Sequence, residues 1–255
     1  SAAAEETLPM RVEGVENWGW RLRWKPAYAD CAFDVAAGET GPSRTWLIFA
    51  DEAGVADRAA AKLRAGGHRV VTVRPGDVFA RLEEHAYTLA PEQGREGYER
   101  LLADLLQRGL APARIAHFWL VTEGEGFRPG SSFFHRVQEQ GFWSLLFLGQ
   151  VLAAETLPEP PHITVVTSGA AQVRDEALPH PEKATVAGPA RVIPRELPGV
   201  TCATLDLALP QPVGRKRRAN RDSELDALAL QVLEELLAQP SEHAAALRGG
   251  GQGAR

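Results

Sequence analysis

The hydrophobic positions of the chain fall into short continuous runs separated by longer stretches in which apolar residues recur at helical spacing. Continuous apolar runs of this length are typical of parallel strands that are covered on both faces. Five such runs predict buried strands at residues 45–51, 68–76, 113–121, 162–169 and 200–207. Strands that alternate with helices at this spacing predict an α/β fold with a doubly wound, mostly parallel sheet.

Helices are predicted between these strands, at residues 54–67, 96–109, 133–155 and 184–197. The first ends at a Gly-Gly pair, which is a common helix stop. The third is long and apolar, and we expect it to bend near Gly141. The fourth is interrupted by prolines, which remove a helical hydrogen bond.

The beginning of the chain has a different pattern. Residues 18–28 alternate large apolar side chains with small or charged ones, and Trp18, Trp20 and Trp24 fall on one side. A period of two predicts a strand with one buried face. We interpret it as an edge strand that covers a core, with a ligand-stacking platform as the alternative.

The remaining segments complete the predicted domain organisation. Residues 1–15 are expected to be a cloning remnant and disordered lead, because the chain starts at Ser1, and the natural protein is then expected to be longer. A globular subdomain would occupy residues 16–210 and a basic linker residues 211–222. Residues 223–239 predict a packing helix capped by Ser223. Residues 240–255 would be a terminal strand remnant or a disordered tail.

Composition narrows the function classes. The 255 residues carry a net charge of −5, which gives no reason to expect nucleic acid or an anionic membrane as partner. No apolar run is long enough for a membrane helix, and the first residues do not resemble a signal peptide. Cys31 and Cys202 are far apart and not in metal-ligand spacing, so we expect a reduced, cytoplasmic protein, although a disulfide is left open.

An α/β sheet suggests a dinucleotide site, which can be tested on the sequence. Such a site needs glycines between the first strand and the first helix, so that the pyrophosphate can rest on the helix amino terminus. The segment ADEAGVADR offers only Gly54 and places Asp51 and Glu52 where the phosphates would lie. Two carboxylates there would repel a pyrophosphate. The phosphate-binding loop is therefore missing.

Short-chain reductases also need a tyrosine four residues before a lysine on one helix, because the lysine activates the tyrosine as proton donor. None of the three tyrosines precedes a lysine in this way. Lys183 lies in a segment whose sequence resembles this helix, but the residue four positions earlier, at 179, is a proline. Ser168, in VVTSGAAQV, stands at the position of the catalytic serine of such reductases, and we interpret it as a turn serine without a base partner.

These segments together resemble the amino-terminal structural subdomain of the ketoreductase region in modular type I polyketide synthases. The resemblance covers about residues 16–248. It is carried by WRLRWKPA, WLIFADEAG, HRVVTVRPG, GYERLLADLL, ARIAHFWLV, FFHRVQEQGFWSLLFLGQVL, HITVVTSGAAQV, VIPRELPGVTCATLDL and HAAALRGG in that order. The family's structural half is a degenerate short-chain-reductase (pseudo-Rossmann) fold without cofactor, and NADPH binds in a separate catalytic half.

The resemblance implies a chain without catalytic, cofactor-binding or metal-binding residues. Lys183 would be an ordinary surface or capping lysine. The chain would brace the NADPH-binding half, or stand beside neighbouring synthase domains. The alternative is a truncated ketoreductase-like domain that stands alone, next to a methyltransferase or a dehydratase.

Two other classes of function remain open. An independent enzyme would use His117, His135 and His162 with Asp51 or Glu123, although their spacing matches no metal motif and no serine-hydrolase motif is present. An acyl carrier protein, which is generally acidic, would be steered by the basic residues of the linker. These are Arg215, Lys216, Arg217 and Arg218.

Overall fold

The computed structural model describes residues 14, 23–124, 132–210, 218–238, 243–248 and 252–254. Within them lies one ten-stranded sheet in the order β1-β10-β9-β8-β7-β6-β2-β3-β5-β4. The strands are β1 Pro26–Ala27, β2 Thr45–Phe49, β3 Arg69–Pro75, β4 Ala80–Glu83, β5 Ala86–Leu89, β6 Arg114–Leu120, β7 His162–Ser168, β8 Thr201–Leu207, β9 Ala244–Arg248 and β10 Gln252–Ala254.

The seven strands from β9 to β5 in this order run parallel, and the strands at both edges are antiparallel to their neighbours. The central strands β2, β6 and β7 are almost entirely buried. The predicted fold class, a doubly wound and mostly parallel sheet, is therefore confirmed. The five predicted strands correspond to β2, β3, β6, β7 and β8.

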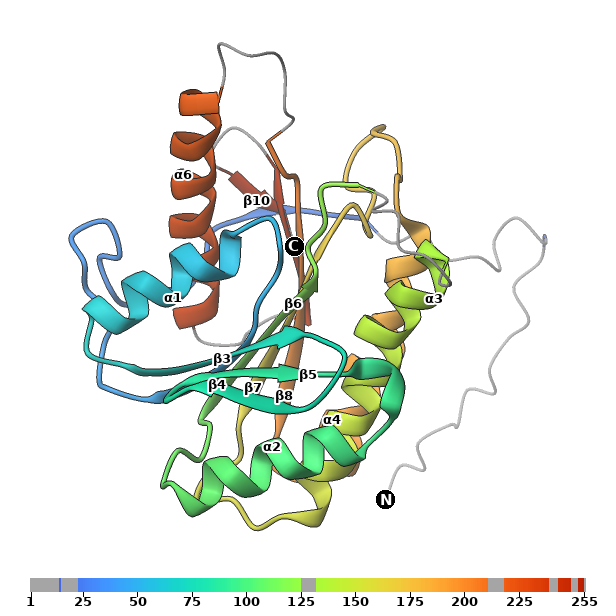
Figure 1. Ribbon diagram of the computed structural model, residues 1–255. Coiled ribbons are helices and arrows are strands. Elements are labelled where there is room, and N and C mark those ends of the chain that lie inside the picture. The colour runs from blue at the N-terminus through green and yellow to red at the C-terminus, as the bar shows by residue number, and fades with distance from the viewer. Residues whose placement is uncertain are drawn as a thin grey trace, which may run out of the picture.

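Helices cover both faces of the sheet (Figure 1). They are α1 Val55–Ala65, α2 Glu96–Gln107, α3 Phe133–Gln138, α4 Ser144–Ala154, α5 Ala187–Glu196 and α6 Arg218–Leu237. α1 and α6 pack together on one face and bury one hydrophobic core, whereas α2, α4 and α5 bury the other on the opposite face. No helix in the described part of the chain is long and apolar enough to cross a bilayer.

The long helix predicted at 133–155 is interrupted where the sequence indicated. Between α3 and α4 lies a π-helical turn, Glu139–Trp143, that contains Gly141. A Cβ atom at Gly141 would lie 2.6 Å from Cδ1 of Leu120 on β6, so only glycine lets the helix approach the sheet this closely. The helix predicted at 184–197 begins earlier, with a 3₁₀ turn over Pro181–Val186 that leads into α5.

The predicted linker at 211–222 and the Ser223 cap need correction. α6 already begins at Arg218, so Ser223 lies inside the helix, and residues 211–217 lie outside the described part of the chain. The first turns look like a linker because they lack apolar residues. Ion pairs hold them instead, since Arg58 on α1 contacts the carboxylates of Asp222 at 3.0 Å and Asp226 at 2.8 Å.

At the chain ends, the predictions are met in part. Residues 244–248 and 252–254 form strands, as the first of the two interpretations of 240–255 expected. The predicted early strand is reduced to Pro26–Ala27, paired with β10, and residues 18–22 lie outside the described part. The expectation for residues 1–15 lies outside it as well, except at Gly14.

Two strands, β4 and β5, were not predicted from the sequence. The short hairpin of β4 and β5 follows β3 at the edge of the sheet, and its four-residue strands are too short to give a hydrophobic pattern.

Cys31 and Cys202 are both free thiols, so no disulfide joins them. Burial raises the pKa of the Cys202 thiol to about 12, which keeps it protonated and unreactive.

Candidate functional site at the carboxyl ends of the strands

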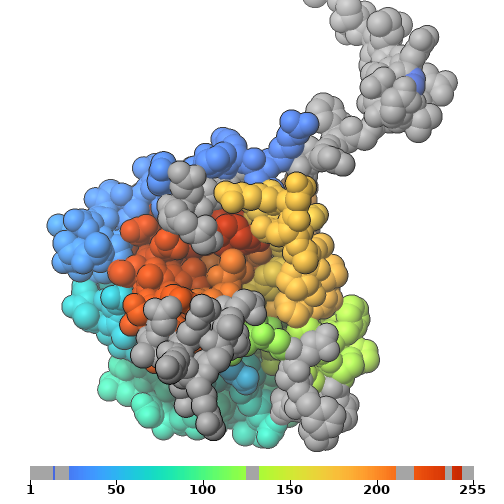
Figure 2. All heavy atoms as spheres, turned by 90° about the horizontal axis from the view of Figure 1, so that it is seen from above, coloured from blue at the N-terminus to red at the C-terminus, as the bar shows by residue number. Residues whose placement is uncertain are grey.

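The parallel strands end together at one edge of the sheet, where ligands bind in open α/β folds. Two hollows lie there. One of about 870 Å³ lies at the ends of β2, β3 and β6, and another of about 440 Å³ lies at the ends of β6, β7 and β8. Figure 2 looks onto this edge, where the gold segment after β7 lies beside the red residues of β9.

Lys183 is completely buried and bonds to Thr122, a residue that lines both hollows. Its ammonium donates three hydrogen bonds, to Thr122 Oγ1 at 2.8 Å, to the carbonyl oxygen of Ser168 at 2.9 Å and to Ser168 Oγ at 3.0 Å. Burial lowers the pKa of Lys183 to about 8, and the charges of Asp206 and Glu182 oppose this shift. The lysine thus remains mostly protonated at neutral pH, with all three of its N–H groups used.

Ser168 is the last residue of β7 and is also buried. Its hydroxyl oxygen accepts a hydrogen bond from the backbone N–H of Thr122 at 3.0 Å, besides that from Lys183. The hydroxyl hydrogen has the carbonyl oxygen of Thr122 as acceptor, at 3.0 Å. The serine is thus turned into a closed network that joins the ends of β6 and β7.

This geometry corrects two interpretations from the sequence. Lys183 is not a surface or capping lysine, because it is fully buried and bonds to β6 and β7. Ser168 is not an isolated turn serine, because an amine lies 3.0 Å from its hydroxyl. Sequence reasoning failed because Lys183 precedes a stretch of ordinary helical composition, and nothing local indicates that its side chain points into the protein.

Pro179 stands where the proton-donating tyrosine of a reductase is expected. A Cβ atom at Gly169, just after β7, would lie 2.7 Å from Cγ of Pro179, so the proline ring packs directly on this turn. Gly169 has φ +72°, a conformation that side-chain-bearing residues rarely adopt. The position at this turn, next to Ser168, is therefore filled by a ring that has no ionisable group and no proton to donate.

A second buried network, missed in the sequence, lies behind this site. Asp206 on β8 accepts hydrogen bonds from the Thr167 hydroxyl at 2.7 Å and from the backbone N–H of Ala170 at 2.8 Å. The guanidinium of Arg248 on β9 pairs with Asp206 at 2.8 Å and with Glu176 at 2.7 Å. An aspartate within the predicted buried strand 200–207 was the available signal, since a buried carboxylate needs partners.

Asp51 follows β2 and is buried at the start of α1. Its carboxylate accepts hydrogen bonds from the backbone N–H groups of Val55 at 3.2 Å and Ala56 at 2.7 Å. Burial raises the pKa of Asp51, and these two N–H groups act against the rise. The helix amino terminus, where a dinucleotide would place its pyrophosphate, is therefore occupied by a side chain of the protein.

The larger hollow in front of α1 has an acidic lining. Among the described residues that line it, four are acidic and one, Arg136, is basic. The acidic residues are Asp51, Glu52, Asp77 and Glu123. Such a surface opposes the binding of a phosphate-rich cofactor.

The other candidate residues are not brought together. His117 is buried in the centre of β6, where its Nε2 contacts the Ser144 hydroxyl at 2.8 Å. His162 begins β7, and His135 lies on α3. No group of three His, Cys, Asp or Glu residues suited to a metal is found in the described part of the chain. The basic residues 215–217 lie outside that part, and nothing is described of the Arg218 side chain.

Comparison with known proteins gives a family match. Residues 45–216 match the model of the family described as "Beta-ketoacyl synthase-like, N-terminal". No curated protein sequence matches the chain.

Several solved structures share the fold. One, an adenylation, ketoreductase and pseudo-Asub multidomain structure of a keto acid-selecting NRPS module, is 27% identical with a TM-score of 0.72. An N-terminal ketoreductase from a macrolactin assembly line is 15% identical with a TM-score of 0.63. The L-sorbose reductase from Gluconobacter frateurii, solved with NADPH and L-sorbose, is 13% identical with a TM-score of 0.57.

The fraction of each solved chain that the match covers differs between these structures. The match covers 91% of this chain in the first two cases, but only 18% of the multidomain module and 42% of the macrolactin ketoreductase. For the sorbose reductase it covers 83% of this chain and 98% of the other. The family match and the two ketoreductase structures confirm the resemblance drawn from the sequence.

Proposed function

Because the chain belongs to the beta-ketoacyl synthase-like, N-terminal family, we propose that it is the non-catalytic structural subdomain of a polyketide synthase ketoreductase. In this role it braces the catalytic half, which binds NADPH, and positions that half within the synthase module. The chain itself binds no cofactor and carries no catalytic residue.

The observation that carries the proposal is the Asp51 carboxylate at the amino terminus of α1. The backbone N–H groups of Val55 and Ala56, which would hold a pyrophosphate in a dinucleotide-binding fold, already donate to this side chain. A phosphate arriving there would have to displace a buried carboxylate and approach its negative charge. Both costs disfavour NADPH.

The Lys183 site supports the same reading. Its ammonium is engaged by three acceptors, and Pro179 stands at the position of the proton donor. The side chains of a reductase site thus serve to hold the ends of β6 and β7 together. They retain the frame of the fold but lack the tyrosine that would protonate a carbonyl oxygen.

We expect the purified chain to show no saturable NADPH binding below about 1 mM. The nucleotide is titrated while its fluorescence and the tryptophan fluorescence of the protein are followed. The sorbose reductase that was solved with NADPH serves as positive control, since it shares this fold. Tight saturable binding by the chain would overturn the assignment as a cofactor-free subdomain.

The bracing role is tested separately. Large apolar side chains on the helical face opposite α1 and α6 are exposed: Phe134 at 55%, Trp143 at 45% and Val192 at 44%. We expect the chain to form a complex with the separately produced catalytic half, detected as a shift in gel filtration. If the two halves stay apart at concentrations of about 100 μM, the chain is instead a truncated ketoreductase-like domain that stands alone.

A further inference from the structure

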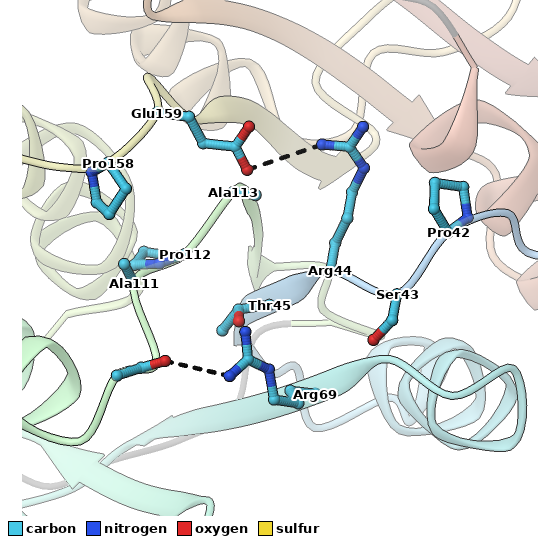
Figure 3. Close-up of a pocket in the computed structure, with 11 residues that line it drawn as sticks. Pro42, Ser43, Arg44, Thr45, Arg69, Ala111, Pro112, Ala113, Pro158 and Glu159 are labelled. Atoms are coloured by element: carbon cyan, nitrogen blue, oxygen red, sulfur yellow. Dashed lines mark hydrogen bonds and ion pairs between the residues drawn. The ribbon is translucent and has the colours of Figure 1, made fainter.

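A third hollow, of about 510 Å³, lies at the opposite edge of the sheet, where the parallel strands begin. It is formed by the segment before β2, the start of β3, the segment before β6 and the segment before β7 (Figure 3). Three prolines and two alanines form its apolar walls. These are Pro42, Pro112, Pro158, Ala111 and Ala113.

Two arginines contribute to this hollow from neighbouring strands. Arg44 precedes β2, and its guanidinium lies 3.8 Å from the carboxylate of Glu159. Arg69 is the first residue of β3, and one of its N–H groups donates to the carbonyl oxygen of Gly109 at 3.2 Å. Within the described residues no carboxylate pairs with Arg69. The hollow therefore carries an excess of positive charge.

A buried hydroxyl points to a missing partner at the same place. Thr45, the first residue of β2, lines the hollow and is only 3% exposed. Its hydroxyl has no hydrogen-bond partner among the described residues. Burying a hydroxyl without a hydrogen-bond partner is unfavourable. Arg69 is exposed, and among the described residues its guanidinium is held by one hydrogen bond, to the Gly109 carbonyl oxygen, so it is able to swing aside and open a path to this hydroxyl.

The charge around Arg44 extends to a third arginine. Arg114 begins β6, and its pKa is lowered by burial first and by the nearby charge of Arg44 second, with Glu159 opposing. One carboxylate thus faces three guanidinium groups at this edge. A bound anion would relieve the repulsion between Arg44 and Arg114.

We propose that this hollow binds a phosphate group. The guanidinium groups of Arg44 and Arg69 would hold its oxygens, and the Thr45 hydroxyl would donate a further hydrogen bond. The phosphate would displace the exposed Glu159 carboxylate, which lies 3.8 Å from the Arg44 guanidinium. A phosphate dianion then matches the two guanidinium groups in charge, and planar guanidinium forks suit its oxygens. The proline and alanine walls leave room for an aliphatic or ring-bearing part of a phosphate ester.

The test is a titration of the whole chain with inorganic phosphate. It is followed by ¹H–¹⁵N NMR, including the arginine side-chain signals, at constant ionic strength set with chloride. We expect saturable shifts in the signals of Arg44, Arg69 and Thr45. Arg44→Ala and Arg69→Ala are each expected to weaken binding at least fivefold.

Thr45→Val provides the variant with the least risk to folding, because it replaces the unpartnered hydroxyl by a methyl group. It is expected to weaken phosphate binding about threefold without lowering the melting temperature, and Thr45→Ser is expected to restore binding. The matched control is Arg191→Ala, an exposed arginine on α5, which should bind phosphate like the parent chain.

Two results overturn the proposal. The first is the absence of saturable shifts, and the second is an equal loss of binding in Arg191→Ala. Acetate at the same ionic strength should bind at least tenfold more weakly, and equal binding would mean a general anion surface rather than a phosphate site. Glycerol 3-phosphate and adenosine monophosphate then distinguish an aliphatic from a nucleotide source of the phosphate group.

Discussion

Replacing Lys183 by alanine is expected to lower the free energy of unfolding by about 3–5 kcal/mol. The side chain is completely buried, so its removal leaves a cavity. It also removes a donor to Thr122 Oγ1 and to the Ser168 carbonyl oxygen, at the ends of two neighbouring strands. Urea unfolding followed by circular dichroism measures the loss.

A pair of further variants separates packing from hydrogen bonding at this position. Lys183→Met keeps the length of the side chain but has no donor, and should lose about 1–3 kcal/mol. Lys62→Ala, on the partly exposed last turn of α1, is the control and should stay within about 0.5 kcal/mol of the parent. A Lys183→Ala variant as stable as this control would mean that the ammonium network does not hold the strand ends.

Acid is expected to destabilise the protein well above the pH at which carboxylates titrate, because of His117. Burial lowers the pKa of His117 to about 3 from its usual 6.5, and its Nδ1 has no hydrogen-bond partner among the described residues. The unfolded chain therefore binds a proton between pH 6.5 and 3 that the folded chain excludes. Stability is complete above pH 6.5 and falls as the pH drops, by about 2 kcal/mol between pH 7 and pH 5.

The loss from this one residue approaches about 5 kcal/mol near pH 3, since each pKa unit corresponds to about 1.4 kcal/mol. His162 adds to it, because burial first and the charge of Arg114 second lower its pKa to about 4. Urea midpoints are measured from pH 7 to pH 4 for the parent and for His117→Phe. The phenylalanine preserves the stacking on Phe49, whose ring centroid lies 4.7 Å from that of the histidine.

His117→Phe should flatten the pH dependence, whereas His135→Gln, an exposed histidine on α3, should leave it unchanged. The readout is the slope of stability against pH, so a constant loss of stability from the substitution does not disturb it. Parallel slopes for the parent and His117→Phe would show that the buried imidazole is not the source of acid sensitivity.

The parallel sheet could be predicted from the sequence because strands that are buried on both faces appear as short continuous apolar runs. Residues 45–49 and 114–120 are covered on both faces, so most of their positions are apolar. The edge hairpin at 80–89 has partly exposed strands of four residues and leaves no such pattern. The start of α6 was missed because its first turns are held by Arg58, a residue distant in the sequence.

For the candidate site, the sequence predicted only which groups of a reductase are missing. A proline at 179, a single glycine at 54 and acidic residues at 51 and 52 are local facts, and they suffice to remove a proton donor and a phosphate loop. The positive contents of the site are long-range. Lys183 contacts Thr122 across 61 positions of the chain, so its burial depends on the arrangement of three elements.

The sequence by itself thus determined the fold class and the family resemblance, and it predicted that a reductase's proton donor and phosphate loop are missing, because these inferences follow from the periodicity and identity of neighbouring residues. Only the tertiary structure decided that Asp51 fills the amino terminus of α1, that Lys183 joins β6 to β7, and that Arg44, Arg69 and Thr45 meet at one hollow. Parallel strands bring residues about 25 positions apart into register, as Thr45 and Arg69 show. Such contacts arise from packing, which local pattern does not encode.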